Sequence, residues 1–92
     1  MKYNIKVSNK YLKDLKLARK RGLNEDLLNE VVKKLSSDIP LEKQHHDHSL
    51  KGNYIGFREC HINPDWLLIY YKDKEVRILS LERTGTHSDL FK

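Results

Sequence analysis

Histidine is the residue type through which this 92-residue sequence could do chemistry, because the chain holds five histidines and only one cysteine. Three of the five lie within four positions, at His45, His46 and His48. A short histidine-rich segment can hold zinc, with Asp47 or Asp65 completing the site, but no second pair of ligands at a fixed spacing accompanies it. An imidazole titrates near neutral pH and can instead act as a general acid or base. Proton transfer is therefore favoured over a metal site.

Two pairs of polar residues near the C-terminus could support such chemistry. His61 and Asp65 stand on either side of an Asn-Pro turn, so the carboxylate can orient or charge the imidazole. Arg83 and His87 flank a Thr-Gly-Thr segment, which places a guanidinium and an imidazole at the end of the last predicted strand. Structural roles are the alternative for both pairs: a histidine at a strand end often packs or caps, and Arg83 could form a surface salt bridge. We expect His45 and His46 to be exposed loop residues without a role.

Cleavage of RNA through its own 2′-hydroxyl needs these kinds of side chain. It requires a base for the hydroxyl, an acid for the departing 5′-oxygen and a cation for the crowded phosphorane. Arginine matches a phosphate through paired N–H donors. Some aromatic side chains could stack on unpaired bases, although burial in the core is their commoner fate: Trp66, Tyr54, Phe57 and Phe91. The residue types therefore suit a ribonuclease that uses no metal.

The net charge of +5 is concentrated at the N-terminus. Residues 1–22 hold eight basic side chains against Asp14 alone, whereas residues 23–92 are slightly acidic. Four lysines share one face of a predicted helix: Lys10, Lys13, Lys16 and Lys20. Such a face attracts polyanions and speeds the encounter with them. The alternative is a solvated helix face that keeps the protein soluble.

Length and composition indicate a single globular domain over residues 1–92. Hydrophobic residues make up 38% of the chain, enough for one core. The longest apolar stretch, from Trp66 to Tyr71, is far shorter than the roughly 20 residues that span a membrane, and no secretory segment precedes it. A single cysteine, Cys60, excludes an internal disulfide framework. We therefore expect a cytoplasmic protein.

The elements that must position these residues are predicted by hydrophobic periodicity. Alternation over residues 3–7 indicates a strand. Two apolar stripes then predict two helices, capped by Ser8 and Asn24 and separated by Gly22, which form an antiparallel hairpin. The stripes are Tyr11, Leu12, Leu15 and Ala18 in the first helix, and Leu27, Leu28, Val31, Val32 and Leu35 in the second.

The second half of the chain predicts a sheet. Residues 42–53 are polar and indicate one ordered loop, and three apolar-rich runs follow, over residues 54–62, 66–71 and 75–84. These runs suit an antiparallel meander. The fold class is therefore α+β: an N-terminal strand and an antiparallel two-helix hairpin packed on a mainly antiparallel sheet of about four strands. We expect the helix-free face of the sheet to be partly polar and to carry the chemistry.

Four motifs over residues 47–91 together resemble the histidine-bearing YafQ branch of the RelE/ParE toxin superfamily. They are Asp47-His48-Ser49-Leu50-x-Gly52, Gly56-Phe57-Arg58-Glu59-x-His61, Pro64-Asp65-Trp66-Leu67-Leu68-Ile69-Tyr70 and Glu82-Arg83-Thr84-Gly85-Thr86-His87-Ser88-x-Leu90-Phe91. The N-terminal half is similar only in outline, as a strand followed by a basic helical hairpin. One departure is Ser49, where the branch often has proline.

The resemblance implies a RelE-like fold and the toxin of a type II toxin–antitoxin system. Such a toxin is a ribosome-dependent endoribonuclease that cuts messenger RNA in the decoding site and needs no cofactor or metal. The implied catalytic positions are His48, His61, Asp65 and His87. Arg83 would contact phosphate, and Trp66 and Phe91 would support the site or contact RNA.

The resemblance also implies partners. A cognate antitoxin, usually of the ribbon-helix-helix type, would wrap the toxin and connect it to DNA indirectly. With a ribosomal target, we expect the four-lysine face to dock on ribosomal RNA or on an acidic antitoxin. Two alternatives stay open: a non-catalytic ParE-type inhibitor of DNA gyrase, which has no evident need for the histidines, and a plain RNA-binding module.

Overall fold

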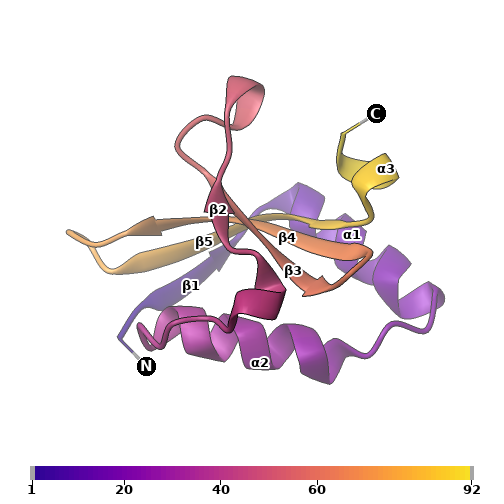
Figure 1. The fold of residues 1–92 in the computed structure, drawn as a ribbon, viewed down its shortest axis with the longest axis horizontal. Coiled ribbons are helices and arrows are strands. Elements are labelled where there is room, and N and C mark those ends of the chain that lie inside the picture. The colour runs from indigo at the N-terminus through magenta and orange to yellow at the C-terminus, as the bar shows by residue number, and fades with distance from the viewer. Residues whose placement is uncertain (1, 92) are drawn as a thin grey trace.

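A computed structural model describes residues 2–91. Its helices and strands follow the chain in this order: β1 (Asn4–Val7), α1 (Asn9–Lys20), α2 (Glu25–Ser36), β2 (His48–Ser49), β3 (Arg58–Asn63), β4 (Trp66–Asp73), β5 (Ile78–Gly85) and α3 (His87–Leu90). Two short 3-10 helices, η1 (Lys43–His45) and η2 (Gly52–Tyr54), lie on either side of β2. The helix pair lies on one side of the sheet, whereas the turn around η2 and helix α3 rise on the other side (Figure 1).

The strands form one sheet in the order β1-β5-β4-β3-β2. β1 runs parallel to β5, and every other pairing is antiparallel. The α+β class and the mainly antiparallel sheet are therefore confirmed. The fifth strand, β2, consists of His48 and Ser49 inside the segment expected to be a loop. It pairs with β3 at the edge of the sheet. A strand in that position can be polar, because it is exposed to solvent.

The helical hairpin is confirmed and begins where the caps were predicted. The Ser8 hydroxyl accepts a hydrogen bond from the amide of Tyr11 at 2.9 Å, and the Asn24 amide oxygen accepts one from the amide of Asp26 at 3.0 Å. Between the helices Gly22 has a φ of +75°, a conformation that favours glycine. The stripes are narrower than expected, since Leu12 and Leu27 remain 45% and 40% exposed.

The main core lies between the hairpin and the sheet. Its helical part includes Tyr11, Ala18, Leu28, Val31 and Leu35, and its strand part includes Cys60, Ile62, Trp66, Leu68, Tyr70, Leu79 and Leu81. Alternate residues of the same strands point to the opposite face, which we call the site face. A smaller apolar cluster lies there: Leu67, Ile69 and Leu90, with Leu50, Tyr54 and Phe57 packed against them. The turn around η2 and helix α3 supply its cover.

Within residues 2–91, no helix is long and apolar enough to cross a lipid bilayer.

Candidate active site

Strand register places the candidate histidines on the site face. His48 pairs with Glu59 across β2 and β3, and His61 pairs with Leu67 across β3 and β4. Leu67 in turn pairs with Gly85 of β5, two residues before His87. Paired residues of neighbouring strands direct their side chains to the same face. Because strands are about 4.8 Å apart, His61 and Gly85 lie roughly 10 Å from each other.

The most unusual group on the site face is the Glu59 carboxylate. Glu59 is 3% exposed. Its Oε1 lies 3.3 Å from Nε2 of His48, and its Oε2 has no hydrogen-bond partner among the described residues. Nδ1 of His48 lies 2.6 Å from the carbonyl oxygen of His46, and a carbonyl can only accept, so Nδ1 carries a proton. Nε2 is therefore the ring nitrogen that faces Glu59.

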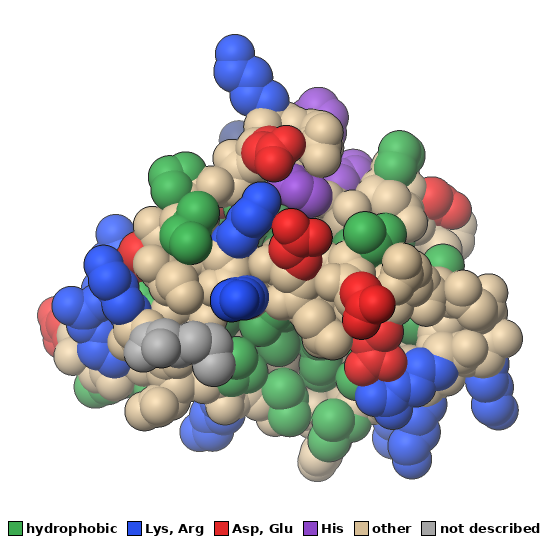
Figure 2. All heavy atoms as spheres, turned by 90° about the horizontal axis from the view of Figure 1, so that it is seen from below, with side chains coloured by type: hydrophobic (Ala, Val, Ile, Leu, Met, Phe, Trp, Pro, Cys, Tyr) green, Lys and Arg blue, Asp and Glu red, His purple; other side chains and the backbone are tan. Residues whose placement is uncertain are grey.

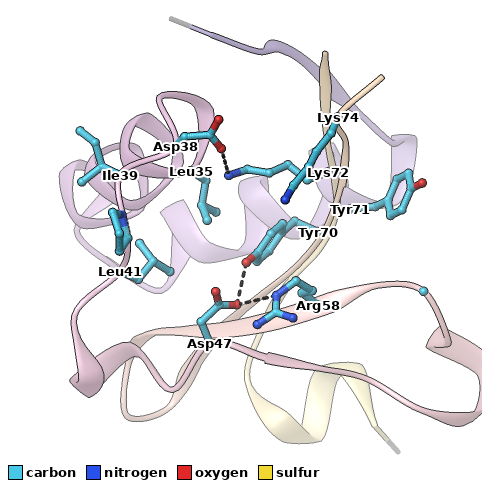
Figure 3. Close-up of a pocket in the computed structure, with 12 residues that line it drawn as sticks. Leu35, Asp38, Ile39, Leu41, Asp47, Arg58, Tyr70, Tyr71, Lys72 and Lys74 are labelled. Carbon is cyan, nitrogen blue, oxygen red and sulfur yellow. Dashed lines mark hydrogen bonds and ion pairs between the residues drawn. The ribbon is translucent and has the colours of Figure 1, made fainter. Parts of the chain in front are cut away.

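The chain around His48 is held by a network on the opposite face of the sheet. The buried Tyr70 hydroxyl donates a 2.6 Å hydrogen bond to Oδ1 of Asp47, and Arg58 Nε donates to the same oxygen at 3.2 Å (Figure 3). Burial, followed by the hydrogen bond to Asp47, raises the pKa of Tyr70. The hydroxyl therefore keeps its proton and remains a donor. Arg58 also donates to the Ser49 hydroxyl at 2.9 Å, so both neighbours of His48 are anchored.

His45 and His46 both contact His61. His46 is exposed, as expected, whereas His45 is half-buried. Nδ1 of His45 donates to the carbonyl oxygen of His61 at 2.6 Å. The rings of His46 and His61 meet edge to face with centroids 5.4 Å apart. Seen from below, the histidine side chains in view lie near one another beside acidic side chains, while the larger groups of lysine and arginine lie toward the sides (Figure 2).

His87 begins helix α3 and is exposed. Its ring lies 5.1 Å from that of Phe91, centroid to centroid. Phe91 contacts Tyr54 at 5.9 Å, and Tyr54 contacts Phe57 at 6.1 Å. The second candidate imidazole therefore stands at the end of a row of aromatic rings. These rings are partly exposed and can contact nucleobases.

Arg83 is half-buried and already paired. Its Nε and Nη2 donate to Asp14 of α1 at 2.7 and 3.0 Å. Hydrogen bonding to Asp14, with a further contribution from Tyr54, raises the pKa of Arg83, so the guanidinium keeps its charge. Nη1 of Arg83 takes no part in the contact with Asp14.

Two residues implied by the resemblance are placed away from the histidines. Trp66 is 1% exposed and lies in the main core, where its indole donates to the Thr84 hydroxyl at 2.8 Å. The expected contact of Trp66 with RNA is therefore corrected to support from inside the core. Asp65 is exposed at the turn between β3 and β4. Within residues 2–91, no hydrogen bond or ion pair joins it to His61, so the expected pairing is not formed in this structure.

The larger cavities lie away from the histidine group, and only a small one of about 130 Å³ is lined in part by a described histidine, His45. A cavity of about 360 Å³ lies beside the Asp47 network, between the end of α2 and β4, and is lined in part by Lys72 and Lys74 (Figure 3). Among the described residues no three side chains of the His, Cys, Asp or Glu type lie together as metal ligands do. The four lysines of α1 are all exposed.

Sequence reasoning missed two residues of this site. Glu59 stands inside a quoted motif, but only the folded chain shows that its carboxylate is buried against His48. Asp14 lies 69 residues before Arg83 and was noticed only as the single acid of a basic segment. The one sequence feature that could have indicated a role for Asp14 is that it is the only acidic residue in this basic segment.

Comparison with known proteins agrees with this fold. A family model described as the bacterial toxin YafQ of type II toxin–antitoxin systems matches residues 3–92. The mRNA interferase toxin YafQ of Escherichia coli K12 is 42% identical over 90 residues, which cover 96% of this chain and 95% of that protein.

Solved structures are also similar to this chain in sequence and in fold. The E. coli DinJ-YafQ toxin-antitoxin complex contains a chain with a TM-score of 0.89 and 39% identity, with 100% of both chains covered. A metal-bound toxin from Helicobacter pylori has a TM-score of 0.91 and 45% identity, covering 97% of this chain and 99% of that one. The chain therefore belongs to the YafQ family of toxins from type II toxin–antitoxin systems.

Proposed function

We propose that this toxin cuts messenger RNA in the decoding site of the ribosome, through attack of the RNA's own 2′-hydroxyl. Membership of the YafQ family makes the chain an mRNA interferase, that is, an endoribonuclease. This activity sets aside the gyrase inhibitor and the non-catalytic RNA-binding module. What remains to be proposed is where the cut occurs and which side chains perform it.

The observation that carries the mechanism is the buried Glu59 beside His48. A neutral His48 with its proton on Nδ1 would turn a nitrogen lone pair toward Oε1 at 3.3 Å. A proton between the two atoms replaces this repulsion with a charge-assisted contact. The pair can therefore take a proton from the 2′-hydroxyl or supply one to the 5′-oxygen.

His87 supplies the second proton-transfer group. We assign His48 and His87 to the acid and base pair, in either order, because both residues are exposed. Between the strands that carry them, Leu67 and Ile69 are buried beneath the turn around η2 and helix α3. Such apolar surroundings exclude water, which strengthens the electrostatic interactions with a bound phosphate.

Arg83, His61 and Asp65 assist. The Nη1 side of Arg83 would stabilise charge on the phosphorane. His61 stands next to the Glu59–His48 pair along β3 and would assist proton transfer. Asp65 would orient a histidine or take a proton once RNA is bound. All these steps use imidazole, carboxylate and guanidinium groups, and none requires a metal or cofactor.

An antitoxin is the expected protein partner, because the similar E. coli chain was solved as a toxin-antitoxin complex. We propose that the antitoxin is of the ribbon-helix-helix type and that this toxin reaches DNA only through it. The exposed lysines of α1 would dock on ribosomal RNA or on acidic segments of the antitoxin.

The test of the mechanism is His87→Ala. We expect this variant to lose growth inhibition and messenger cleavage, because a proton-transfer group typically contributes about 10²- to 10⁴-fold to the rate. Its thermal unfolding and its antitoxin binding should match those of the wild type, since the His87 ring is exposed. Primer extension after induction, with and without the antitoxin, maps the cuts. Full toxicity of His87→Ala at equal expression would contradict the assignment.

A further inference from the structure

Helix α1 contacts the C-terminal part of the site through two side chains that lie seven residues apart. Asp14 accepts both hydrogen bonds from Arg83 and a third from the amide of Thr84 at 3.2 Å. Arg21, which caps the C-terminal end of α1, donates to the carboxylate of Asp89 in α3 at 2.6 and 3.1 Å. A spacing of seven residues is close to two helical turns, so both side chains lie on the same side of α1.

The contact between Asp14 and Arg83 fixes the plane of the guanidinium. Two parallel N–H···O bonds define the orientation of an arginine in a way that a single contact cannot. The side chains of Arg83 and Asp14 are only 20% and 13% exposed, so solvent screens the pair weakly. Nη1 of Arg83, which takes no part in the contact with Asp14, therefore has a defined direction before any RNA is bound.

The contact between Arg21 and Asp89 fixes helix α3. Four residues form too short a helix to be stable alone, so tertiary contacts must hold α3 in place. Asp89 and Thr86 cap each other reciprocally at 2.9 and 3.1 Å. A Cβ on Gly85 would meet the Asp89 carboxylate at 2.9 Å, so β5 and the capped carboxylate are closely packed. Arg21 connects this unit, and His87 within it, to α1.

We propose that α1 positions the reacting groups: Asp14 orients Arg83, and Arg21 orients His87 by holding Asp89. Neither Asp14 nor Arg21 touches RNA, and both are positioning residues. The inference rests on the proposed function, because it explains how the groups assigned there are held ready. It also explains why Asp14, the single acidic residue of the basic segment 1–22, is present there.

Arg21→Gln tests the second contact, and Arg19→Gln is its matched control. Arg19 lies on the same helix and donates to Glu25 at 2.7 and 3.0 Å, so its replacement removes the same charge and a similar ion pair away from the site. We measure single-turnover cleavage on programmed ribosomes, ribosome affinity and thermal unfolding. Arg21→Gln should slow cleavage about tenfold or more, because small misplacements of reacting groups have such effects. Its affinity for ribosomes should equal that of the Arg19→Gln control. Arg19→Gln should cleave at the wild-type rate.

Asp14→Asn tests the first contact in a kinetic cycle with Arg83→Ala. If Asp14 acts through Arg83, Asp14→Asn slows cleavage about tenfold when Arg83 is present and causes no further loss when it is absent. A role of Asp14 in folding alone would slow both backgrounds equally and would lower thermal stability in proportion.

Three results would overturn the inference: a wild-type rate for Arg21→Gln, an equal loss in Arg19→Gln, or an equal effect of Asp14→Asn in both backgrounds. Failure of the proposed function looks different, because His87→Ala and Arg83→Ala would then cleave normally. If those two variants are inactive while Arg21→Gln cleaves normally, only the positioning role is lost.

Discussion

At the scale of single residues, a buried carboxylate with a free oxygen needs an explanation. A carboxylate removed from water and left partly unpaired destabilises the folded chain by about 1–3 kcal/mol or more. Glu59 is such a group, since one oxygen faces His48 and the other has no partner within residues 2–91. We propose that this cost serves proton transfer, because Glu59 lies on the site face beside His48.

Glu59→Gln separates these two effects. The amide keeps the shape of the side chain but cannot accept a proton from His48, so we expect cleavage to slow by about 10²-fold. Because a buried charge is removed, the free energy of unfolding should not fall below that of the wild type. Glu82→Gln, a half-buried glutamate of β5, serves as the control and should cleave normally. Equal activity of Glu59→Gln and wild type would return Glu59 to a structural role.

Sequence reasoning found the residues with intrinsic reactivity and missed those that depend on their surroundings. His48, His61 and His87 were selected because imidazole is an acid–base group suited to neutral pH and because the family motifs include them. The special character of Glu59 arises from burial, which a sequence does not display. For Trp66 the sequence left both core burial and contact with RNA open, because an aromatic residue on a strand can face either side, and here it faces the core.

At the scale of elements, the segment that carries His48 has almost no regular structure of its own. Strand β2 has two residues, so its placement depends on side chains anchored to the neighbouring strands. The hydrogen bond from Tyr70 to Asp47 is the shortest of these anchors and is shielded from solvent on the Tyr70 side. The position of His48 therefore depends on the hydrogen bond between Tyr70 and Asp47.

Tyr70→Phe tests the anchor. Loss of the hydroxyl leaves Asp47 without its buried donor, so we expect the free energy of unfolding to fall by about 1–2 kcal/mol. The amides of residues 47–49 should exchange hydrogen faster, and cleavage should slow because His48 is less well placed. Tyr71→Phe is the control, since Tyr71 is the neighbouring tyrosine and is 42% exposed. Unchanged exchange in Tyr70→Phe would show that Arg58 alone holds the segment.

Local signals predicted the helices well and the edge strand poorly. Ser8, Asn24 and Gly22 act within one or two turns of the chain, so their patterns specify the hairpin directly. Strand β2 forms only because β3 is beside it. The contacts of α1 with β5 and α3 join residues 68 or 69 positions apart, and no local pattern encodes them.

At the scale of the whole molecule, α1 divides its charges between two sides. Asp14 and Arg21 turn toward the site, while the four lysines, at positions 10, 13, 16 and 20, are exposed. The inward charges are paired, and the outward lysines take part in none of the ion pairs found among the described residues. An outward cationic surface that is separate from the reacting groups suits docking on a polyanion.

Lys13→Glu/Lys16→Glu tests the docking surface. We expect weaker binding to ribosomes and a slope of log K against log salt that is smaller by about 2, near one unit for each lost phosphate contact. Lys33→Glu/Lys74→Glu makes the same change of net charge at exposed positions elsewhere and should bind normally. Binding that is unchanged in the first variant would reduce the lysines of α1 to a solubilising surface.

The strand order has a consequence for the synthesis of this toxin. β5 is the last strand made, yet it lies between β1 and β4 and joins the first strand to the rest of the sheet. A growing chain therefore cannot close the sheet before residue 85 has been added, and His87 follows only two positions later. Such distant pairings also form slowly. We therefore expect that a nascent copy can neither complete this sheet nor place His87 beside it until β5 has been synthesised.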